Sequence, residues 1–362
     1  MKIIHLSIIS LLFTGLFLLP TSPSLGQKVL RVGVAGLKHD HVHNIMHQFK
    51  NGEVIIAGIA ESDPQLIARY KKSYQLPDSL FYNTLPELIA HTHPDAVLAY
   101  NAISEHLGVV EICAPLGISV MVEKPLATTV KDADRIAALA QQYHIHVLTN
   151  YETTWYDTNQ QLYEMVNANA IGEPRKMVAH DGHQGPKEIG CSADFLNWLT
   201  DPVKNGGGAS RDFGCYGADL MTWLMQGQAP IAVTAMFHHI KPSVYPKVED
   251  DATILLEYPN ATGIIEGSWN WPFSIKDWEV FGVTGYLHAL NDKELQERTK
   301  RSYDSVTVHP ASYHDNIAYL ADVLSGKTDP GHDLSSLPTN LIVVRILEAA
   351  TRSAKEGRRI VL

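Results

Sequence analysis

Two hydrophobic patterns divide the chain. In its first part, short runs of apolar, mostly β-branched residues alternate with segments in which apolar positions recur every three or four residues. The runs predict buried strands at 29–35, 54–60, 96–100, around Val120 and at 145–148. The segments between them predict helices at 43–50, from Asp63-Pro64 onward, and at 85–90, 105–116 and 131–143. This alternation predicts an α/β domain built on a doubly wound parallel sheet.

The pattern changes after residue 150. Longer strand candidates follow one another, without predicted helices between them, at 173–181, 231–238, 252–258, 262–268 and 278–283. The sequence Tyr258-Pro-Asn-Ala-Thr262 is typical of a hairpin turn, and helical segments at 313–324 and 339–355 close the chain. We therefore predict two domains, 28–150 and 151–362, the second an α+β domain with a mostly antiparallel sheet.

The first 26 residues are typical of a secretory signal. Lys2 supplies the positive start, residues 8–19 form an apolar segment too short to span a bilayer, and residues 22–26 offer small residues for cleavage. We expect a Sec-type signal peptide over 1–26, and a mature protein that is periplasmic or secreted and not membrane-bound. The alternative is an uncleaved N-terminal anchor.

Composition and charge narrow the partners. The chain has 45% hydrophobic and 19% charged residues, as ordinary globular proteins do, and a formal net charge of −10. A nucleic acid or an anionic membrane needs a basic surface, so neither is an expected partner. Cys113, Cys191 and Cys215 are too few for a disulfide framework, although one bridge between Cys191 and Cys215 is compatible with export.

The first candidate for chemistry is the strand Ile118–Glu123, followed by Lys124-Pro125. The residue before a proline favours extended backbone, so Lys124 is expected at the carboxyl end of a buried parallel strand. Ligands bind at that end of open α/β sheets. A lysine there, beside the acid Glu123, can hold a hydroxyl group or move a proton. The alternative is a lysine that only reaches solvent.

A nucleotide site is expected after the first strand. Gly36 keeps the first glycine of the dinucleotide fingerprint, whereas Lys38 and His41 replace the second and third. Lys38 can instead contact the phosphates through its ammonium group. Glu61 ends the second strand, where an acid accepts hydrogen bonds from a ribose and repels a 2′-phosphate, which favours NAD over NADP. The alternative is that Glu61 caps the following helix.

Four histidines surround this turn. Alternating histidines such as His39, His41, His43 and His47 can bind zinc. However, His41 and His43 are expected to point in different directions, and no nearby acid has a ligand-like spacing. We therefore expect no metal here, and assign His39 and His41 to the cofactor site instead, with ordinary polar positions at a helix start as the alternative.

A second constellation follows Gly206-Gly207-Gly208. Asp212, Tyr216 and Asp219 are spaced four and seven residues apart, which predicts one face of a single helix. An acid and a phenol on one face can act as an acid–base or substrate-positioning pair. The alternative is a glycine-rich loop before an ordinary amphipathic helix.

Polar and aromatic residues elsewhere suggest substrate contacts. His183 and Lys187 lie in a loop that leaves the first strand of the second domain, so they are candidates for binding a substrate, with a structural role as the alternative. Trp269 and Trp271 offer aromatic faces for stacking, although core packing explains them equally well.

Together these motifs resemble the Gfo/Idh/MocA oxidoreductases over residues 28–362. The Glu123-Lys124-Pro125 element, the strand–helix rhythm before it and the triple glycine followed by D-x-G-x-[HY]-x-x-D occur in the same order. The resemblance implies an N-terminal Rossmann domain, an open antiparallel sheet in the second domain, a bound NAD and chemistry on a sugar or polyol. It also implies a homo-oligomer, a dimer or tetramer.

The resemblance also implies roles for individual residues. Lys124 is the catalytic lysine beside the cofactor, Asp212 positions the substrate, and Tyr216 removes the hydroxyl proton after Lys124 lowers its pKa. The remaining residues expected around the cofactor are Glu61, Asn101, His106 and Glu123. The chain departs from the family pattern at Lys38 and His41, and Asn101-Ala102 replaces a Thr-Pro pair.

The leading hypothesis is thus an NAD(P)-dependent oxidoreductase that acts on a carbohydrate hydroxyl, with a tightly bound and recycled cofactor. Two alternatives remain. One is an NAD-dependent glycosidase that oxidises its substrate transiently, and the other is a non-catalytic sugar-binding protein on a Rossmann scaffold.

Overall fold

The computed structural model describes residues 29–362, so the expected signal peptide lies outside the described residues. The N-terminal domain is a six-stranded sheet with the order β3-β2-β1-β4-β5-β6, in which every pair is parallel. Its strands are β1 (Arg31–Ala35), β2 (Ile55–Ala60), β3 (Phe81–Tyr82), β4 (Ala96–Ala99), β5 (Ser119–Glu123) and β6 (Val147–Asn150). The predicted Rossmann sheet is confirmed.

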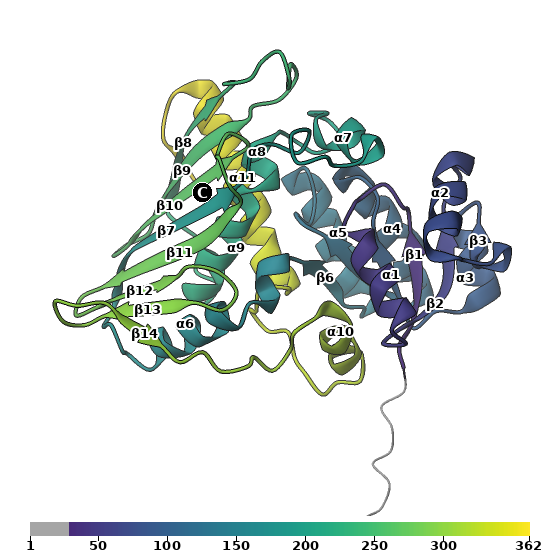
Figure 1. The fold of residues 1–362 in the computed structure, drawn as a ribbon, viewed down its shortest axis with the longest axis horizontal. Helices are drawn as coiled ribbons and strands as arrows, with labels where there is room; N and C mark the ends of the chain where they lie inside the picture. The colour runs from purple at the N-terminus through teal and green to yellow at the C-terminus, as the bar shows by residue number, and fades with distance from the viewer. Residues whose placement is uncertain (1–28) are drawn as a thin grey trace, which may run out of the picture.

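Helices cover both faces of this sheet (Figure 1). They are α1 (Val42–Lys50), α2 (Pro64–Tyr74), α3 (Leu85–Thr92), α4 (His106–Cys113) and α5 (Val130–Tyr143), with short 3₁₀ helices η1 (Asp78–Leu80), η2 (Ile103–Glu105) and η3 (Ala114–Leu116). Local signals explain several ends. The Asp63 carboxylate caps α2 by accepting from two backbone N–H groups, and Gly117 ends the α4–η3 helix with a φ of +68°.

The C-terminal domain contains a nine-stranded sheet with the order β14-β13-β12-β11-β7-β10-β9-β8-β15. Its strands are β7 (Pro174–Gly182), β8 (Ala232–His238), β9 (Asp251–Glu257), β10 (Thr262–Ser268), β11 (Ile275–Gly282), β12 (Tyr286–Ala289), β13 (Leu295–Arg298), β14 (Asp304–Val306) and β15 (Ile360–Val361). The β7–β10 pair is parallel and the other pairs are antiparallel. The predicted mostly antiparallel sheet is therefore confirmed, and the hairpin after Tyr258 joins β9 to β10.

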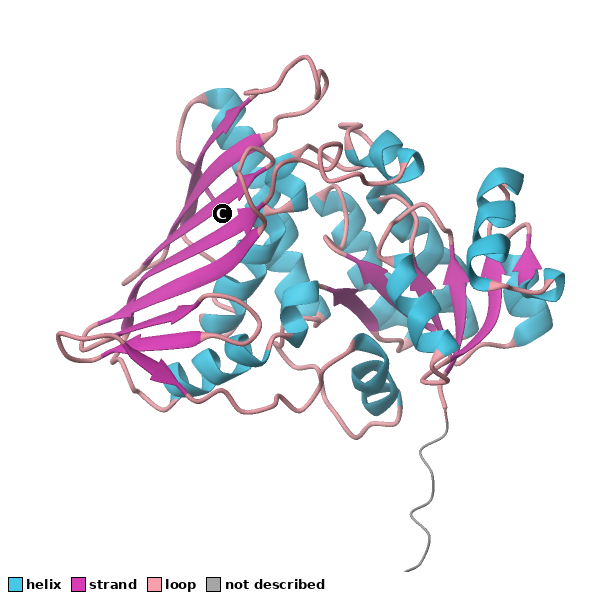
Figure 2. Ribbon diagram, viewed as in Figure 1, coloured by secondary structure: helices cyan, strands magenta, loops and turns pink. Residues whose placement is uncertain are grey.

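The helices of this domain lie on the side of the sheet that faces the Rossmann domain, and the opposite face is open in Figure 2. They are η4 (Glu152–Trp155), α6 (Asp157–Asn167), α7 (Ala193–Leu199), α8 (Ala209–Asp212), α9 (Gly214–Leu224), α10 (Asn316–Leu324) and α11 (Leu337–Glu356). The prediction of no helices between the strands is wrong, because α7, α8 and α9 lie between β7 and β8. These three helices lie between the nine-stranded sheet and the Rossmann domain.

The two domains share hydrophobic cores. Ile317 and Leu320 of α10 pack with the apolar residues of α1, and Val344 of α11 is buried in the cluster that holds Ile136 of α5. These contacts place the carboxyl end of β5 opposite the second sheet. The gap between the two sheets at that point is where the candidate site lies.

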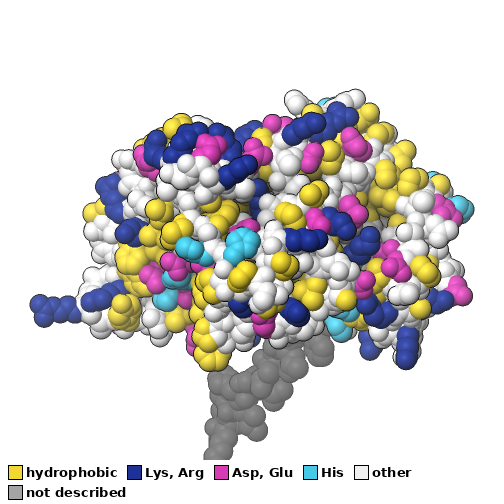
Figure 3. Space-filling view, turned by 90° about the horizontal axis from the view of Figure 1, so that it is seen from above, with side chains coloured by type: hydrophobic (Ala, Val, Ile, Leu, Met, Phe, Trp, Pro, Cys, Tyr) yellow, Lys and Arg dark blue, Asp and Glu magenta, His cyan; other side chains and the backbone are white. Residues whose placement is uncertain are grey.

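Three further expectations can be compared with the described residues. Cys113, Cys191 and Cys215 are free thiols, so the bridge between Cys191 and Cys215 that the sequence left open is not formed. Within residues 29–362, no helix has the length and apolarity needed to cross a bilayer. Basic and acidic side chains are interspersed over the face shown in Figure 3, in keeping with the net charge of −10.

Candidate active site

A buried ion pair lies where β5 faces the C-terminal domain. The ammonium Nζ of Lys124, directly after β5, lies 2.5 Å from Oδ1 and 2.9 Å from the main-chain oxygen of Asp212. The two side chains are 5% and 8% exposed. Burial is the largest influence on both groups and opposes their charges. The attraction between them outweighs it, since the pKa of Lys124 is raised and the pKa of Asp212 is lowered.

The triple glycine brings Asp212 to this position. A Cβ on Gly208 would lie 1.9 Å from the main-chain oxygen of Glu249, so only glycine fits. The Glu249 carboxylate accepts from the backbone N–H groups of Gly208 and Ser210, at 2.7 and 3.3 Å. The second oxygen of Asp212 accepts from the indole N–H of Trp269 at 2.9 Å. The turn and the indole together fix the carboxylate before any ligand binds.

The prediction that Asp212, Tyr216 and Asp219 share one helix is wrong. Asp212 ends the short helix α8, and a new helix begins at Gly214 after the break at Phe213. Within the described residues, neither oxygen of the Asp219 carboxylate has a hydrogen-bond partner, and the group is fully buried. Burial, followed by the nearby Asp333, raises the pKa of Asp219 well above its usual range. Asp219 therefore lies in the core as a neutral acid.

The expected activation of Tyr216 is also wrong. The Lys124 ammonium lies 4.9 Å from the centre of the Tyr216 ring, as a cation over a π face, while its hydrogen bonds go to Asp212. Burial, and after it the charges of Glu152 and other acids, raises the pKa of the Tyr216 phenol well above 10. The raised pKa favours the protonated phenol, the form that donates to or orients a substrate.

Three site residues were missed in the sequence. Lys276 on β11 places its ammonium 5.1 Å from the Tyr216 ring centre and forms an ion pair with Glu152. Asp181 lies opposite Lys276 in the β7–β11 pairing and is 1% exposed. Burial, partly opposed by Lys276, raises the pKa of Asp181 to about 8. The signal was present, because Lys276 precedes the buried Trp278 by two residues and so shares its face.

The two predicted sugar contacts differ in position. His183 is half-buried, its ring meets Phe213 edge-on at 4.9 Å, and Nδ1 accepts from the N–H of Gly185 at 2.9 Å. Burial lowers the pKa of His183 although Asp212 opposes this, so the imidazole is neutral and close to the ion pair. Lys187 is exposed, and within residues 29–362 its side chain has no hydrogen-bond or ion-pair partner. The structure brings only His183 to the site.

A cavity of about 250 Å³ lies beside the glycine turn and is lined by Gly36, Lys38, Glu61 and Asn101. Gly36 has a φ of +82°, and a Cβ there would meet the Cβ of Asn101 at 3.0 Å. The Glu61 carboxylate accepts from the backbone N–H groups of Leu37, Ser62 and Asp63, at 3.1, 2.8 and 2.9 Å. It thus braces the glycine turn, and the cap of α2 is Asp63.

Two buried polar atoms of the N-terminal domain are available to form hydrogen bonds with a ligand. Within the described residues, Oδ1 of Asn101 and Nε2 of His106 are buried and lack hydrogen-bond partners. His106 Nδ1 bonds to the main-chain oxygen of Leu126 at 3.1 Å, and burial lowers the pKa of His106 to about 4, so its Nε2 carries a lone pair. Buried polar groups normally have partners, and a bound nucleotide with amide and hydroxyl groups can supply them.

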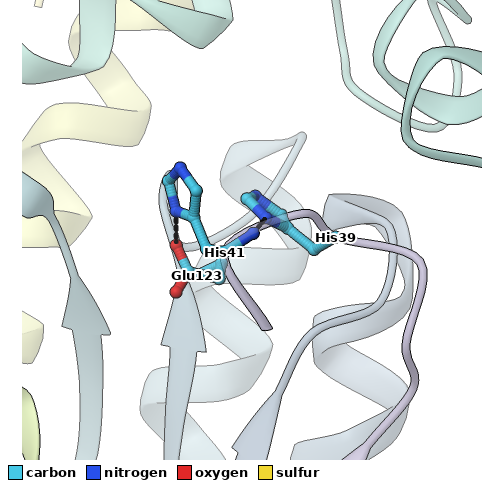
Figure 4. Close-up of side chains that lie close together, drawn as sticks. All are labelled: His39, His41 and Glu123. Carbon is cyan, nitrogen blue, oxygen red and sulfur yellow. Dashed lines mark hydrogen bonds and ion pairs between the residues drawn. The ribbon is translucent and has the colours of Figure 1, made fainter. Parts of the chain in front are cut away.

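His39, His41 and Glu123 come together at the end of β5 (Figure 4). Nδ1 of His41 lies 2.8 Å from Oε2 of Glu123, whose other oxygen accepts from the amide of Asn150 at 2.9 Å. His43 points elsewhere, as expected, and bonds to the Tyr74 hydroxyl at 2.5 Å. No acid close in sequence has a ligand-like spacing, but the fold brings Glu123, 82 residues away, to 2.8 Å from His41.

A segment of the C-terminal domain crosses the glycine turn, and we call residues 191–199 the α7 strap. Asp40 accepts from the N–H and hydroxyl of Ser192 at 2.9 and 2.6 Å, and the Trp198 indole donates to the main-chain oxygen of Lys38 at 3.1 Å. Arg69 forms an ion pair with Asp194 at 2.7 Å. The strap therefore fastens the second domain onto the residues that follow Gly36.

A Rossmann sheet with a ligand cavity at its glycine turn, beside a buried lysine–carboxylate pair, defines a nucleotide-dependent oxidoreductase. Residues 28–151 match the model of the oxidoreductase family with an NAD-binding Rossmann fold, and residues 159–288 match the Gfo/Idh/MocA C-terminal domain. The chain belongs to the Gfo/Idh/MocA family of NAD-binding oxidoreductases.

Related proteins are distant in sequence. The chain is 23% identical to bovine (Bos taurus) trans-1,2-dihydrobenzene-1,2-diol dehydrogenase over 71% of its length and 72% of that enzyme. It is 25% identical to the rhizopine catabolism protein MocA of Rhizobium meliloti over 58% of its length and 63% of that protein. The match to the Xenopus tropicalis dihydrodiol dehydrogenase, 22% identical, spans 57% of that enzyme.

Solved structures share the fold over most of the chain. The aldose-aldose oxidoreductase of Caulobacter crescentus, complexed with glycerol, superposes with a TM-score of 0.77, 23% identity, and coverage of 92% of this chain and 100% of that one. An inositol dehydrogenase homologue from Azotobacter vinelandii, complexed with NAD⁺, gives a TM-score of 0.79 at 17% identity, over 92% and 97% of the two chains.

Proposed function

We propose that this protein oxidises a hydroxyl group of a sugar, polyol or glycoside with NAD. The observation that carries the proposal is the buried Lys124–Asp212 pair at the carboxyl end of β5, beside the nucleotide cavity. An aldose oxidoreductase and an inositol dehydrogenase homologue share this fold, which supports the substrate class. The Glu61 carboxylate at the cavity favours NAD over NADP, because it repels a 2′-phosphate.

Separate sets of residues would bind the cofactor and the substrate. Gly36, Lys38, Glu61 and Asn101 would hold NAD, which when bound accepts a hydride from the substrate carbon. Lys124 would hold the substrate hydroxyl oxygen. During oxidation the hydroxyl proton would pass to Nζ of Lys124, and Nζ would give one of its own protons to Asp212, 2.5 Å away. Tyr216 and the neutral His183 orient the sugar by hydrogen bonds.

The α7 strap is compatible with a retained cofactor, because four polar contacts fasten it to the Rossmann domain, three of them to the residues just after the glycine turn. We further propose that residues 1–26 direct export, so that the mature enzyme works in the periplasm or outside the cell. Retention fits that location, since a recycled cofactor avoids dependence on free NAD.

We also propose a homo-oligomer formed through the open face of the nine-stranded sheet. Met236, Leu255 and Phe281 lie on it, with exposed fractions of 56%, 41% and 37%. Burying such side chains on a second copy is favourable. Sedimentation of the mature protein tests this, and a monomer at micromolar concentration contradicts it.

The first experiment is mass spectrometry of the nucleotide released when the purified mature protein is denatured. Stoichiometric NAD or NADH supports the proposal. No nucleotide, together with no NAD binding on titration, refutes it and favours a sugar-binding protein.

Product analysis by NMR on a panel of glycosides then identifies the reaction. A keto sugar with one NADH per turnover supports oxidation. Free sugar without net NADH indicates the glycosidase reaction instead. Lys124→Met should abolish turnover, whereas the matched variant Lys293→Met, at an exposed lysine, should leave it unchanged.

A further inference from the structure

One cluster beside the active site is not used by the proposed chemistry. One ligand atom each from His39, His41 and Glu123 lies within 4.8 Å of the other two. The three residues come from the glycine turn and from the end of β5, directly before Lys124 (Figure 4). His39 and Glu123 are 1% and 2% exposed, whereas the His41 side chain is 31% exposed.

The charge of Glu123 lacks a permanent counter-charge. Its two oxygens accept from the ring of His41 and from the amide of Asn150. The adjacent Lys124 directs its ammonium to Asp212, and among residues 29–362 no lysine or arginine forms an ion pair with Glu123. Buried carboxylates are normally paired with a cation or bound to a metal. The carboxylate of Glu123 would therefore be stabilised by a cation bound at this site.

His39 is fixed by packing and by one hydrogen bond. Its ring lies against Phe195 and Trp198, with ring centres 4.9 and 5.2 Å away. Its Nδ1 accepts from the backbone N–H of His41 at 3.1 Å, so the ring is in the neutral form that binds metals. An ion bound through either ring nitrogen would replace this hydrogen bond, because the neutral ring has a single lone pair to offer.

We propose that His39, His41 and Glu123 bind one divalent transition-metal ion of the zinc type. Two imidazoles and one carboxylate, with a fourth position left open, form a donor set that catalytic zinc sites use. Ligand atoms around a tetrahedral zinc lie about 3.3 Å apart, given bonds of about 2.0–2.1 Å. Small side-chain rotations thus close the cluster from its present span of 4.8 Å or less.

Two features make the ion compatible with its surroundings. The partly exposed His41 lines a solvent-connected cavity of about 540 Å³, which gives the ion an entry path. The positive charge of Lys124 is offset by Asp212 at 2.5 Å, so repulsion of a nearby cation is reduced. An ion here would add a second positive group next to the hydroxyl that Lys124 is proposed to hold.

The test uses tag-free mature protein, freed of metal with a chelator and titrated with Co²⁺ and Zn²⁺, with and without NAD. We expect one equivalent to bind, with visible Co²⁺ bands typical of tetrahedral coordination and displacement by Zn²⁺. His41→Ala and Glu123→Gln should each weaken binding on the order of 100-fold. His43→Ala is the matched control, because this histidine lies two residues away and bonds to Tyr74 instead.

Each outcome is decisive. Saturable binding that is lost in both cluster variants and kept in His43→Ala supports the site. Absence of saturable binding by the wild-type protein overturns it, as does equal binding by all variants. Circular dichroism of each variant shows whether a loss reflects unfolding. The readout needs no turnover, so failure here leaves the proposed oxidoreductase activity standing.

Discussion

Removing the Lys124 ammonium should lower the free energy of unfolding, because the buried Asp212 carboxylate then lacks a counter-charge. In Lys124→Met the stem of the side chain remains, while Asp212 loses the ammonium from both its main-chain oxygen and Oδ1. Breaking a buried pair from one side costs about 3–5 kcal/mol. We expect about 3 kcal/mol, because the Trp269 indole still donates to the other oxygen of Asp212.

The sign of the pH dependence follows from the pKa shifts. The lowered pKa of Asp212 contributes stability that is present above about pH 4 and lost as pH falls through its folded value. The raised pKa of Lys124 contributes stability that is present below about pH 10 and lost as pH rises through its folded value. The deficit of Lys124→Met should therefore be largest between about pH 4 and 10 and shrink only outside this window.

Urea unfolding at about pH 3, 7 and 11 measures this deficit on both sides of the window, and Lys124→Met/Asp212→Asn completes the cycle. The double variant should recover a large part of the lost stability at pH 7, because no charge is then left unpaired, yet remain inactive. An equal deficit at all three pH values would refute the reasoning, as would a double variant no more stable than the single one.

Three other predictions concern neighbouring acids and the phenol. Tyr216→Phe should lower kcat/KM by less than about tenfold, which is the worth of one neutral hydrogen bond. A loss near a thousandfold would instead indicate that the Tyr216 phenol is the base that removes the hydroxyl proton. Asp219→Asn should stabilise the protein more at pH 8 than at pH 5. The raised pKa of Asp219 costs stability as pH rises above about 4, and the asparagine does not titrate. Chemical unfolding at the two pH values measures the gain, and equal gains would contradict this. Asp181→Asn should remove an inflection near pH 8 from the kcat/KM profile, and an unchanged profile excludes Asp181 from the titration.

The Rossmann half and the position of Lys124 could be predicted because their determinants are local. Apolar runs, the Asp63-Pro64 helix start and the proline after Lys124 each act within a few residues. The start of the short helix α8 could not, because Glu249 holds its N-cap Gly208 from 41 residues away. Spacing alone therefore suggested one continuous helix.

Long-range pairing also explains the missed site residues. Lys276 meets Glu152 across 124 residues, and His41 meets Glu123 across 82. The pKa of Tyr216 was predicted in the wrong direction for a related reason. Sequence can indicate that a lysine is near a phenol, but whether the lysine reaches the hydroxyl or the ring face is decided by packing.

The α7 strap bears on the rate at which a bound nucleotide is released. If the strap must open before a nucleotide on the glycine turn can leave, the bonds from Ser192, Asp194 and Trp198 to the Rossmann domain have to break first. The residence time would then contain the opening free energy of one short helix in addition to the intrinsic affinity of the cavity. Hydrogen exchange at the amides of α7 and the release of labelled NAD should consequently follow one and the same opening equilibrium.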